Sequence, residues 1–213
     1  MRRIIVLQEL ELPHIGENIT TLCIDIGLSY DAPHSKHWLS LHPDVFVFGF
    51  EPVPENCKNV LETIKDDRFH LYQCAVSNKN EKKKFNITKH DATIEKDRGQ
   101  SSFYKPATGA PFKVEEEIEV DCISLNSFLL LIDWDKFKEI TILKIDTQGH
   151  DSIIIQDIKP YFDKLPRIKL EVSTRGEYED TPDTSPQEIK KFMEENGYHL
   201  VHDLCEDHYY ERR

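Results

Sequence analysis

Two acidic residues stand at the ends of apolar runs, where they could contact a ligand. Asp25 and Gly27 close the run Thr21–Ile26, and Glu51 closes the run Val45–Phe50. In an open α/β sheet, ligands bind outside the carboxyl ends of the strands. A glycine lets a ligand approach the backbone closely, and a carboxylate on the second strand can accept both hydroxyl hydrogens of a ribose. The pattern predicts a nucleoside-cofactor site.

The turn after Gly27 distinguishes between cofactors. It continues through Ser29 and lacks the GxGxxG spacing that admits the pyrophosphate of NAD or FAD. S-adenosylmethionine (SAM) has no phosphate but carries an ammonium and a sulfonium cation, so Asp25 suits SAM better than a dinucleotide. A third run ends in small side chains that leave a slot for a flat adenine, although plain strand packing explains them equally well. These side chains are Cys74, Ala75 and Val76.

A polar loop after a later apolar run offers candidates for catalysis. The run Ile140–Ile145 is followed by Asp146, Gln148, His150 and Asp151. Histidine has an unperturbed pKa near neutrality, so His150 is the first choice as general base for an attacking hydroxyl, with Asp146 second. We expect Gln148 and Asp151 to lie beside the substrate, although Asp151 could also simply cap the following helix.

A divalent metal is a weaker interpretation of the same loop. Asp146, Asp151 and Glu171 could together offer carboxylates to a cation. Three oxygen ligands are barely enough for such a site, because hard cations prefer six or more. We therefore predict no metal site.

Residues 88–116 are predicted to form a flap or substrate loop. The segment is polar and contains Gly99, Pro106 and Gly109, and structureless segments of this length are uncommon in compact domains. Ser101, Ser102 and Tyr104 combine hydroxyls with an aromatic ring, which suits closure over a polyol. An insertion without a role is the alternative.

The elements that position these residues alternate between short apolar runs and amphipathic segments. This alternation predicts an α/β, Rossmann-like fold with a mostly parallel sheet and helices on both faces. Ser185 is expected to cap the last helix, and the last two strands to include an antiparallel edge. The expected strands are Thr21–Ile26, Val45–Phe50, Phe69–Val76, Lys82–Ile87, Glu117–Ile123, Ile140–Ile145, Arg167–Val172, Tyr198–Leu204 and His208–Arg212, and the expected helices are Pro33–Leu41, Pro54–Lys65, Leu125–Leu131, Asp151–Phe162 and Pro186–Asn196.

Composition excludes several classes of protein. A length of 213 residues suits a single domain over residues 1–213. The formal net charge of −12 should repel a phosphate backbone, so nucleic acid is a poor partner. The longest apolar runs are too short to span a membrane. The five cysteines are scattered without a CxxC pair, which favours a reducing compartment and a cytoplasmic protein.

Four motifs in register resemble the FkbM-type SAM-dependent methyltransferases, from about residue 20 to the C-terminus. The motifs are Ile24–Asp25–Ile26–Gly27, Gly49–Phe50–Glu51–Pro52, Ala75–Val76–Ser77, and Leu143–Lys144–Ile145–Asp146 followed by Gly149 and an acid. The resemblance implies a class I methyltransferase fold with a seven-stranded sheet. It also implies methyl transfer from SAM to an oxygen, often of a sugar or natural product. By position, Asp25 and Gly27 would line the methionine portion, Glu51 the ribose, and residues 74–76 the adenine.

Two departures from the family pattern bear on function. The first loop, residues 28–33, lacks a later glycine, and Gln148 replaces a common acid, which weakens any metal interpretation. We expect a SAM-dependent O-methyltransferase for a hydroxyl of a sugar, a glycan or a similar small molecule. The alternative is a catalytically inactive α/β binding or scaffold module of a larger glycan-processing protein, which the missing glycine favours slightly. A dinucleotide oxidoreductase would need the absent GxGxxG.

Overall fold

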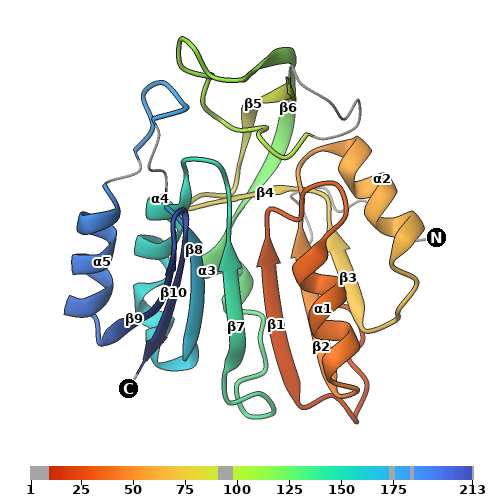
Figure 1. Ribbon diagram of the computed structural model, residues 1–213. Coiled ribbons are helices and arrows are strands. Elements are labelled where there is room, and N and C mark those ends of the chain that lie inside the picture. Colours follow the sequence, from red (N-terminus) through yellow and green to blue (C-terminus); the bar gives the residue numbers. More distant parts are fainter. Residues whose placement is uncertain (1–9, 91–97, 173–175, 183–184, 213) are drawn as a thin grey trace.

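A seven-stranded sheet forms the centre of the molecule (Figure 1). The computed structural model describes residues 10–90, 98–172, 176–182 and 185–212. The sheet order is β3-β2-β1-β7-β8-β10-β9, in which neighbours from β3 to β8 are parallel and β10 is antiparallel to both β8 and β9. This arrangement confirms the mostly parallel sheet and its antiparallel edge. The strands are β1 (Thr21–Ile26), β2 (Val45–Phe50), β3 (Phe69–Tyr72), β7 (Ile140–Ile145), β8 (Arg167–Glu171), β9 (Tyr198–Leu204) and β10 (Asp207–Arg212).

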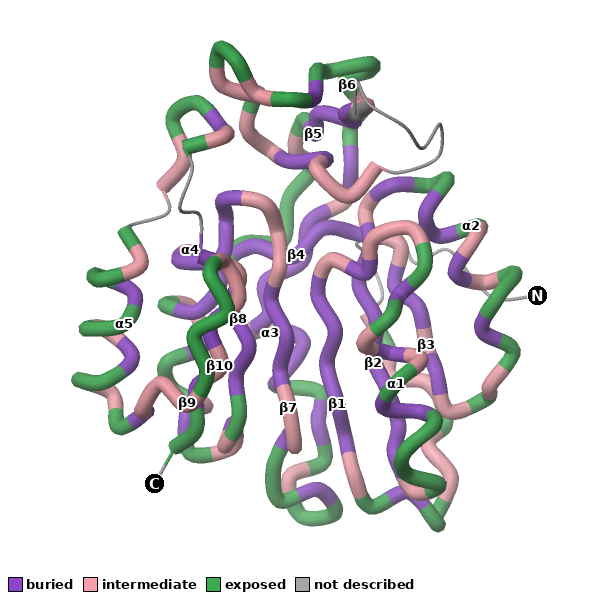
Figure 2. The backbone as a smooth tube through the Cα atoms, in the orientation of Figure 1, coloured by how far each residue is buried: buried purple, intermediate pink, exposed green. Residues whose placement is uncertain are grey.

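Helices cover both faces of this sheet, as the alternating pattern predicted. On one face, α1 (Pro33–Leu41) and α2 (Pro54–Thr63) pack through residues such as Trp38 and Val60 against β1 and β2. On the other, α3 (Leu125–Leu129), α4 (Asp151–Asp157) and α5 (Pro186–Glu195) enclose the larger apolar cluster. The central strands are buried along most of their length (Figure 2), as expected for parallel strands covered on both sides.

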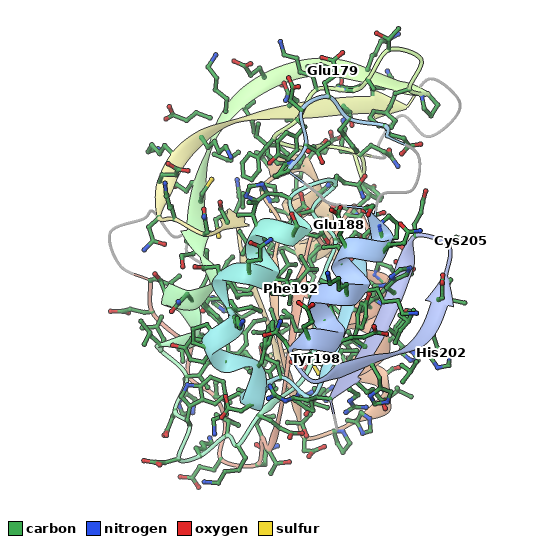
Figure 3. The ribbon with its side chains drawn as sticks, turned by 90° about the vertical axis from the view of Figure 1, so that its left-hand side faces the viewer. Glu179, Glu188, Phe192, Tyr198, His202 and Cys205 are labelled. Carbon is green, nitrogen blue, oxygen red and sulfur yellow. The ribbon has the colours of Figure 1, made fainter. Side chains whose placement is uncertain are left out.

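The last helix begins at the predicted cap. The side chain of Ser185 accepts a hydrogen bond from the amide of Glu188, and the Glu188 carboxylate accepts one from the amide of Ser185, which forms a complete capping box. Phe192 on α5 and Tyr198 at the start of β9 (Figure 3) both lie with their rings edge-on to Phe162. These contacts hold α5 and the edge strands against the rest of the core.

A second, three-stranded sheet stands above the carboxyl ends of β1, β2 and β7 (Figure 1). Its order is β4-β6-β5, formed by β4 (Ala75–Ser77), β5 (Glu81–His90) and β6 (Phe112–Ser124). The single strand predicted over Phe69–Val76 was therefore wrong. The chain turns where the amide of Cys74 donates to the carbonyl of Tyr72, and β4 then pairs with β6 instead of continuing in the large sheet.

Two other predicted boundaries were also wrong. The loop expected over residues 88–116 is shorter, because β5 continues to His90 and β6 already begins at Phe112, with their ends paired in antiparallel register. The helix expected over Asp151–Phe162 ends at Asp157 and is followed by a 3-10 helix, Lys159–Lys164. Pro160 explains this break, since it has no N–H to donate within an α-helix.

The state of the cysteines and the length of the helices relate to the expected reducing compartment and to the expected lack of a membrane span. Cys23, Cys57, Cys74 and Cys122 are buried free thiols, while Cys205 is exposed and also free. Among the helices that the structure describes, none has the length and apolar character needed to cross a membrane.

Candidate functional site

A cavity of about 260 Å³ lies at the carboxyl ends of β1, β2, β7 and β8, beneath the small sheet. Nine of the fourteen residues predicted for the site line it. They come from four strand ends, from β4 and from the segment that follows residue 97. The nine are Gly27, Ser29, Glu51, Cys74, Ala75, Val76, Ser101, Asp146 and Gln148. The other five, Asp25, Ser102, Tyr104, His150 and Asp151, lie outside the lining.

Gly27 joins the two sides of the cavity. Its φ is +76°, and a Cβ at this position would overlap the backbone oxygen of Asp146. The amide of Gly27 also donates to the carbonyl of Phe50 (3.0 Å), while the amide of Asp146 donates to that of Ile26 (3.1 Å). A glycine was predicted here so that a cofactor could approach. The structure gives a second reason for a glycine at this position, since the backbone oxygen of Asp146 occupies the space that a Cβ would need.

The first loop keeps a left-handed backbone without its later glycine. Ser29 has a φ of 58° and Ala32 a φ of 47°, in a region that costs a residue with a side chain roughly 1–2 kcal/mol. At Ser29 this conformation directs the amide to the carboxylate of Glu51, at 3.0 Å. Two residues of this loop thus adopt a backbone conformation that glycine adopts more easily, although neither is a glycine.

Glu51 presents a fixed, buried carboxylate to the cavity. Its side chain is 3% exposed. Its oxygens accept hydrogen bonds from the amides of Ser29 (3.0 Å) and Val53 (2.9 Å) and from the side-chain amide of Asn56 (3.3 Å). Burial raises the pKa of Glu51 to about 7, although these N–H donors act in the opposite direction. The group can therefore accept hydrogen bonds from a ligand above neutral pH.

Asp25, by contrast, faces the interior. It accepts hydrogen bonds from the amide (3.1 Å) and hydroxyl (2.6 Å) of Ser35 at the start of α1. On its other side, the ammonium of Lys144 lies 3.5 Å away. The structure thus places Asp25 where it holds the first loop to α1, one layer behind the cavity wall.

Lys144 is a buried cation under the site. Its ammonium donates to the carbonyls of Ile26 and Gly27 and lies 3.3 Å from the carboxylate of Asp146. Burial alone would lower the pKa of this lysine, but the carboxylates of Asp146 and Asp25 outweigh it and raise the pKa. The lysine is consequently charged and compensates part of the acidic cluster above it.

Asp146 and Glu171 form a pair of carboxyl groups on the cavity wall. The side-chain amide of Gln148 donates to Asp146 at 2.8 Å and to Glu171 at 2.5 Å. Burial acts to raise the pKa of Asp146, but Lys144 and these hydrogen bonds bring it below its ordinary value. Burial and the charge of Asp146 raise the pKa of Glu171 well above its ordinary value. Among the described residues, no cluster of three or more potential ligands is arranged to hold a metal ion.

His150 is enclosed by protein. Its Nε2 lies 2.9 Å from the Ser77 hydroxyl and its Nδ1 lies 2.7 Å from the Tyr104 hydroxyl. The ring of Phe103 packs edge-on against it at 5.0 Å. Burial, with the charge of Lys83 nearby, lowers the pKa of His150 to about 4, so the ring is neutral at physiological pH. Both ring nitrogens therefore already lie within hydrogen-bond distance of protein hydroxyls, and His150 does not line the cavity.

The other predicted substrate residues hold the loops together. Ser101 lines the cavity, and its hydroxyl accepts a hydrogen bond from the amide of Thr88 at 3.1 Å. Ser102 donates to the backbone oxygen of Gln148 at 2.7 Å. The carboxylate of Asp151, the first residue of α4, accepts from the amide (2.9 Å) and hydroxyl (2.5 Å) of Thr147 in the preceding loop. Ser102 and Asp151 therefore act on the shape of the loop after β7.

The residues predicted for the adenine slot form one wall of the cavity. Cys74, Ala75 and Val76 are buried and apolar, and burial raises the pKa of the Cys74 thiol. The slot lies where the chain passes from the large sheet to the small one, since β4 starts at Ala75.

Asn56, Glu171 and Arg98 are among the cavity residues that the sequence did not assign to a cofactor or substrate site. Asn56 lies five residues after Glu51, in the first turn of α2, and its side-chain amide donates to the Glu51 carboxylate, a relation that the short spacing could have indicated. Glu171 was predicted only as a weak metal ligand, although it ends a strand just as Glu51 follows one. Arg98 lines the cavity and pairs with Glu115 at 2.7 Å, and no local pattern pointed to it.

Comparisons with known proteins identify the family of the chain. The family model described as the methyltransferase FkbM domain matches residues 14–200. A solved structure, the methyltransferase FkbM from Methylobacillus flagellatus KT, shares the fold with a TM-score of 0.54 at 12% identity. The similarity covers 91% of this chain and 44% of that chain, so this chain spans less than half of that protein. Curated proteins gave no match. Because the family model covers most of its length, the chain belongs to the FkbM methyltransferase domain family.

Proposed function

We propose that this chain is a SAM-dependent O-methyltransferase that acts on a hydroxyl of a sugar, a glycan or a similar hydroxylated small molecule. The observation that carries the proposal is the buried carboxylate of Glu51 on the cavity wall. Three N–H donors fix its orientation, and a ribose offers two hydroxyl hydrogens to such a carboxylate. Membership of a methyltransferase family supports methyl transfer as the reaction.

The remaining cavity residues fit the other parts of SAM. Gly27 and Ser29 would lie against the methionine portion, and the apolar wall at residues 74–76 against the adenine. Asp25 would act indirectly, by holding the loop through Ser35. Bound SAM supplies a methyl group that its sulfonium already activates, so the protein's residues have to orient the acceptor and remove its proton.

The side of the cavity opposite Glu51 suits a hydroxylated acceptor. Ser101, Gln148 and Asp146 provide polar groups there, and the ring of Phe103 can pack on the apolar face of a sugar. Ser102, Tyr104 and Asp151 lie outside the cavity lining, where they form hydrogen bonds with Gln148, His150 and Thr147. The net charge of −12 disfavours a nucleic acid as the acceptor.

An inactive scaffold module is the competing proposal. The sequence feature that favoured it was the missing glycine in the first loop. Because Ser29 and Ala32 already adopt the left-handed backbone, no feature of the described cavity favours this alternative. It predicts that the chain binds neither SAM nor its demethylated product.

Calorimetric titration with SAM and with S-adenosylhomocysteine tests the proposal. We expect micromolar binding to the wild-type chain. Glu51→Ala should weaken the affinity on the order of 100-fold, because two hydrogen bonds to a charged group are lost. Glu62→Ala, which removes an exposed acid of α2 outside the cavity lining, is the matched control and should leave the affinity unchanged. No heat with either ligand would refute a SAM site.

The acceptor requires a second assay. Isotopically labelled SAM should be incubated with a panel of neutral sugars and glycans, and methylated products read by mass. Transfer to a hydroxyl supports the proposal, whereas transfer only to amines or to carbon would contradict O-methylation.

A further inference from the structure

We propose that Glu171 is the general base that accepts the proton of the acceptor hydroxyl, and that Asp146 and Gln148 are the residues that position it. This inference rests on the proposed function and assigns the proton transfer within the same cavity. It is carried by the placement of the two carboxyl groups and by their different partners.

Glu171 and Asp146 face the same space. They stand at the carboxyl ends of the neighbouring parallel strands β8 and β7, whose last paired residues are Leu170 and Ile145. Both line the cavity. A base must lie within hydrogen-bond reach of the proton that it removes, and these two carboxyl groups are presented on the wall where the acceptor is proposed to bind.

The two carboxyl groups have different partners. Asp146 lies 3.3 Å from the ammonium of Lys144 and accepts a hydrogen bond from Gln148 at 2.8 Å. A carboxylate compensated in this way holds a proton weakly. Among the residues that the structure describes, no cation lies within ion-pair distance of Glu171, so the charge of Lys144 acts on it only from farther away, and Glu171 lies beside the negative charge of Asp146. Glu171 is therefore the member of the pair that gains most from taking up a proton.

Gln148 holds this pair in place. Its φ is 56°, an unusual backbone for a residue with a side chain. Its amide nitrogen donates to both carboxyl groups, and its amide oxygen accepts from the Tyr178 hydroxyl at 2.8 Å. The Ser102 hydroxyl secures its backbone oxygen. All of these contacts fix the distance between the two acids.

The charges around Glu171 favour its protonated form more than those around an ordinary glutamate do. Asp146 faces it from β7 and Asp151 from α4, and the cation Lys144 below is shared between Asp146 and Asp25 on β1. Burial and these acids raise the pKa of Glu171, and a base works best when its pKa is near the working pH. The remaining titratable neighbour, Tyr178, has a raised pKa and stays neutral.

The proposed step conserves atoms and charge. The acceptor oxygen forms a bond to the methyl carbon of the sulfonium, and the sulfur keeps the electron pair of the broken carbon–sulfur bond. The hydroxyl proton moves to the ionised Glu171 carboxylate, so a methyl ether and a neutral thioether result. Glu171 then releases the proton to solvent.

The titration of Glu171 tests this inference without an acceptor. In protein labelled with ¹³C at the glutamate side-chain carboxyl, the resonance that disappears in Glu171→Gln should titrate at higher pH than ordinary glutamates. In Asp146→Asn it should titrate at lower pH, since the neighbouring charge is gone. A Glu171 that titrates in the ordinary range of glutamates, or whose titration does not change in Asp146→Asn, would overturn the inference whatever the acceptor panel gives.

Kinetics with the acceptor found by the panel complete the test. Glu171→Gln should lower kcat about 100-fold or more, a typical contribution of a general base, while the SAM affinity changes less than threefold. In Asp146→Asn the rise of kcat with pH should move to lower pH. A Glu171→Gln enzyme with nearly wild-type kcat would overturn the inference and leave the proposed function intact. If the wild-type chain does not bind SAM, the proposed function itself is refuted.

Discussion

The cavity has a glutamate at each end, and the two are supported in opposite ways. Glu51, at the end of β2, is surrounded by three N–H donors. Glu171, at the end of β8, is paired with another acid through the amide of Gln148. Donors fix a carboxylate in one orientation and suit it to hold a ligand, whereas a neighbouring acid favours proton uptake. The same residue type thus serves two chemistries according to its neighbours.

The Glu51 end and the Glu171 end of the cavity must keep a fixed relative position to act on the same reaction. Gly27 lies where these two ends meet. Its amide bonds to the end of β2, and its Cα faces the backbone oxygen of Asp146. We expect Gly27→Ala to reduce stability more than any other substitution proposed for this chain. Strain at φ +76° and overlap with a backbone atom together should reduce the free energy of unfolding by about 4 kcal/mol.

Urea denaturation measures this loss, and calorimetry should show that SAM binding falls with it. Gly109→Ala is the matched control, because Gly109 also has a positive φ (+95°) but has no atom within 4 Å of the added Cβ. It should cost about 1 kcal/mol. If both substitutions destabilise equally, the close approach of Gly27 to the backbone of Asp146 adds no cost beyond the strain of the positive φ.

Much of this arrangement could be predicted from the sequence because strand ends are local features. Apolar runs that end in Asp25, Glu51 and Asp146 place these residues at one edge of a parallel sheet. The direction of a side chain is not local. Asp25 faces inward because Ser35 and Lys144 offer it partners, and these contacts form only when the chain is folded.

His150 shows the same limit more clearly. Its residue type and its loop suggested a base, but its environment depends on Ser77 and Tyr104, which the small sheet and the segment before β6 bring to it. That sheet was itself only half predicted, since β4 was assigned to the preceding strand. The wrong assignment of β4 therefore hid the surroundings of His150, because these contacts come from distant parts of the fold.

Protonation of Glu51 should produce the next largest effect. Its folded pKa of about 7 lies above its ordinary value of 4.5, so proton binding favours the folded state. This contribution is fully present below about pH 4.5 and is lost as the pH rises through about 7. Relative to Glu51→Gln, the wild type should lose about 2–3 kcal/mol of unfolding free energy between pH 5 and pH 8.

Denaturation of both proteins at the two pH values, without ligand, checks this difference, and Glu62→Gln should behave as wild type. SAM affinity should also weaken below about pH 7, as Glu51 becomes protonated. Parallel pH curves for wild type and Glu51→Gln would mean that the N–H donors already keep Glu51 ionised, which would sharpen the contrast with Glu171.

The smallest expected effect concerns the residues behind the wall. Tyr104→Phe removes the hydroxyl at 2.7 Å from His150 Nδ1 and should reduce the unfolding free energy by about 1–2 kcal/mol, because one buried ring nitrogen loses its partner. Tyr209→Phe, whose hydroxyl has no hydrogen-bond partner within the described residues, should cost less. SAM affinity and the rate of methyl transfer should stay within threefold of wild type. A tenfold loss of rate with unchanged SAM affinity would indicate that His150 is the base, because a base depends on the group that orients it. Asp146 and Glu171 would then have only a structural role.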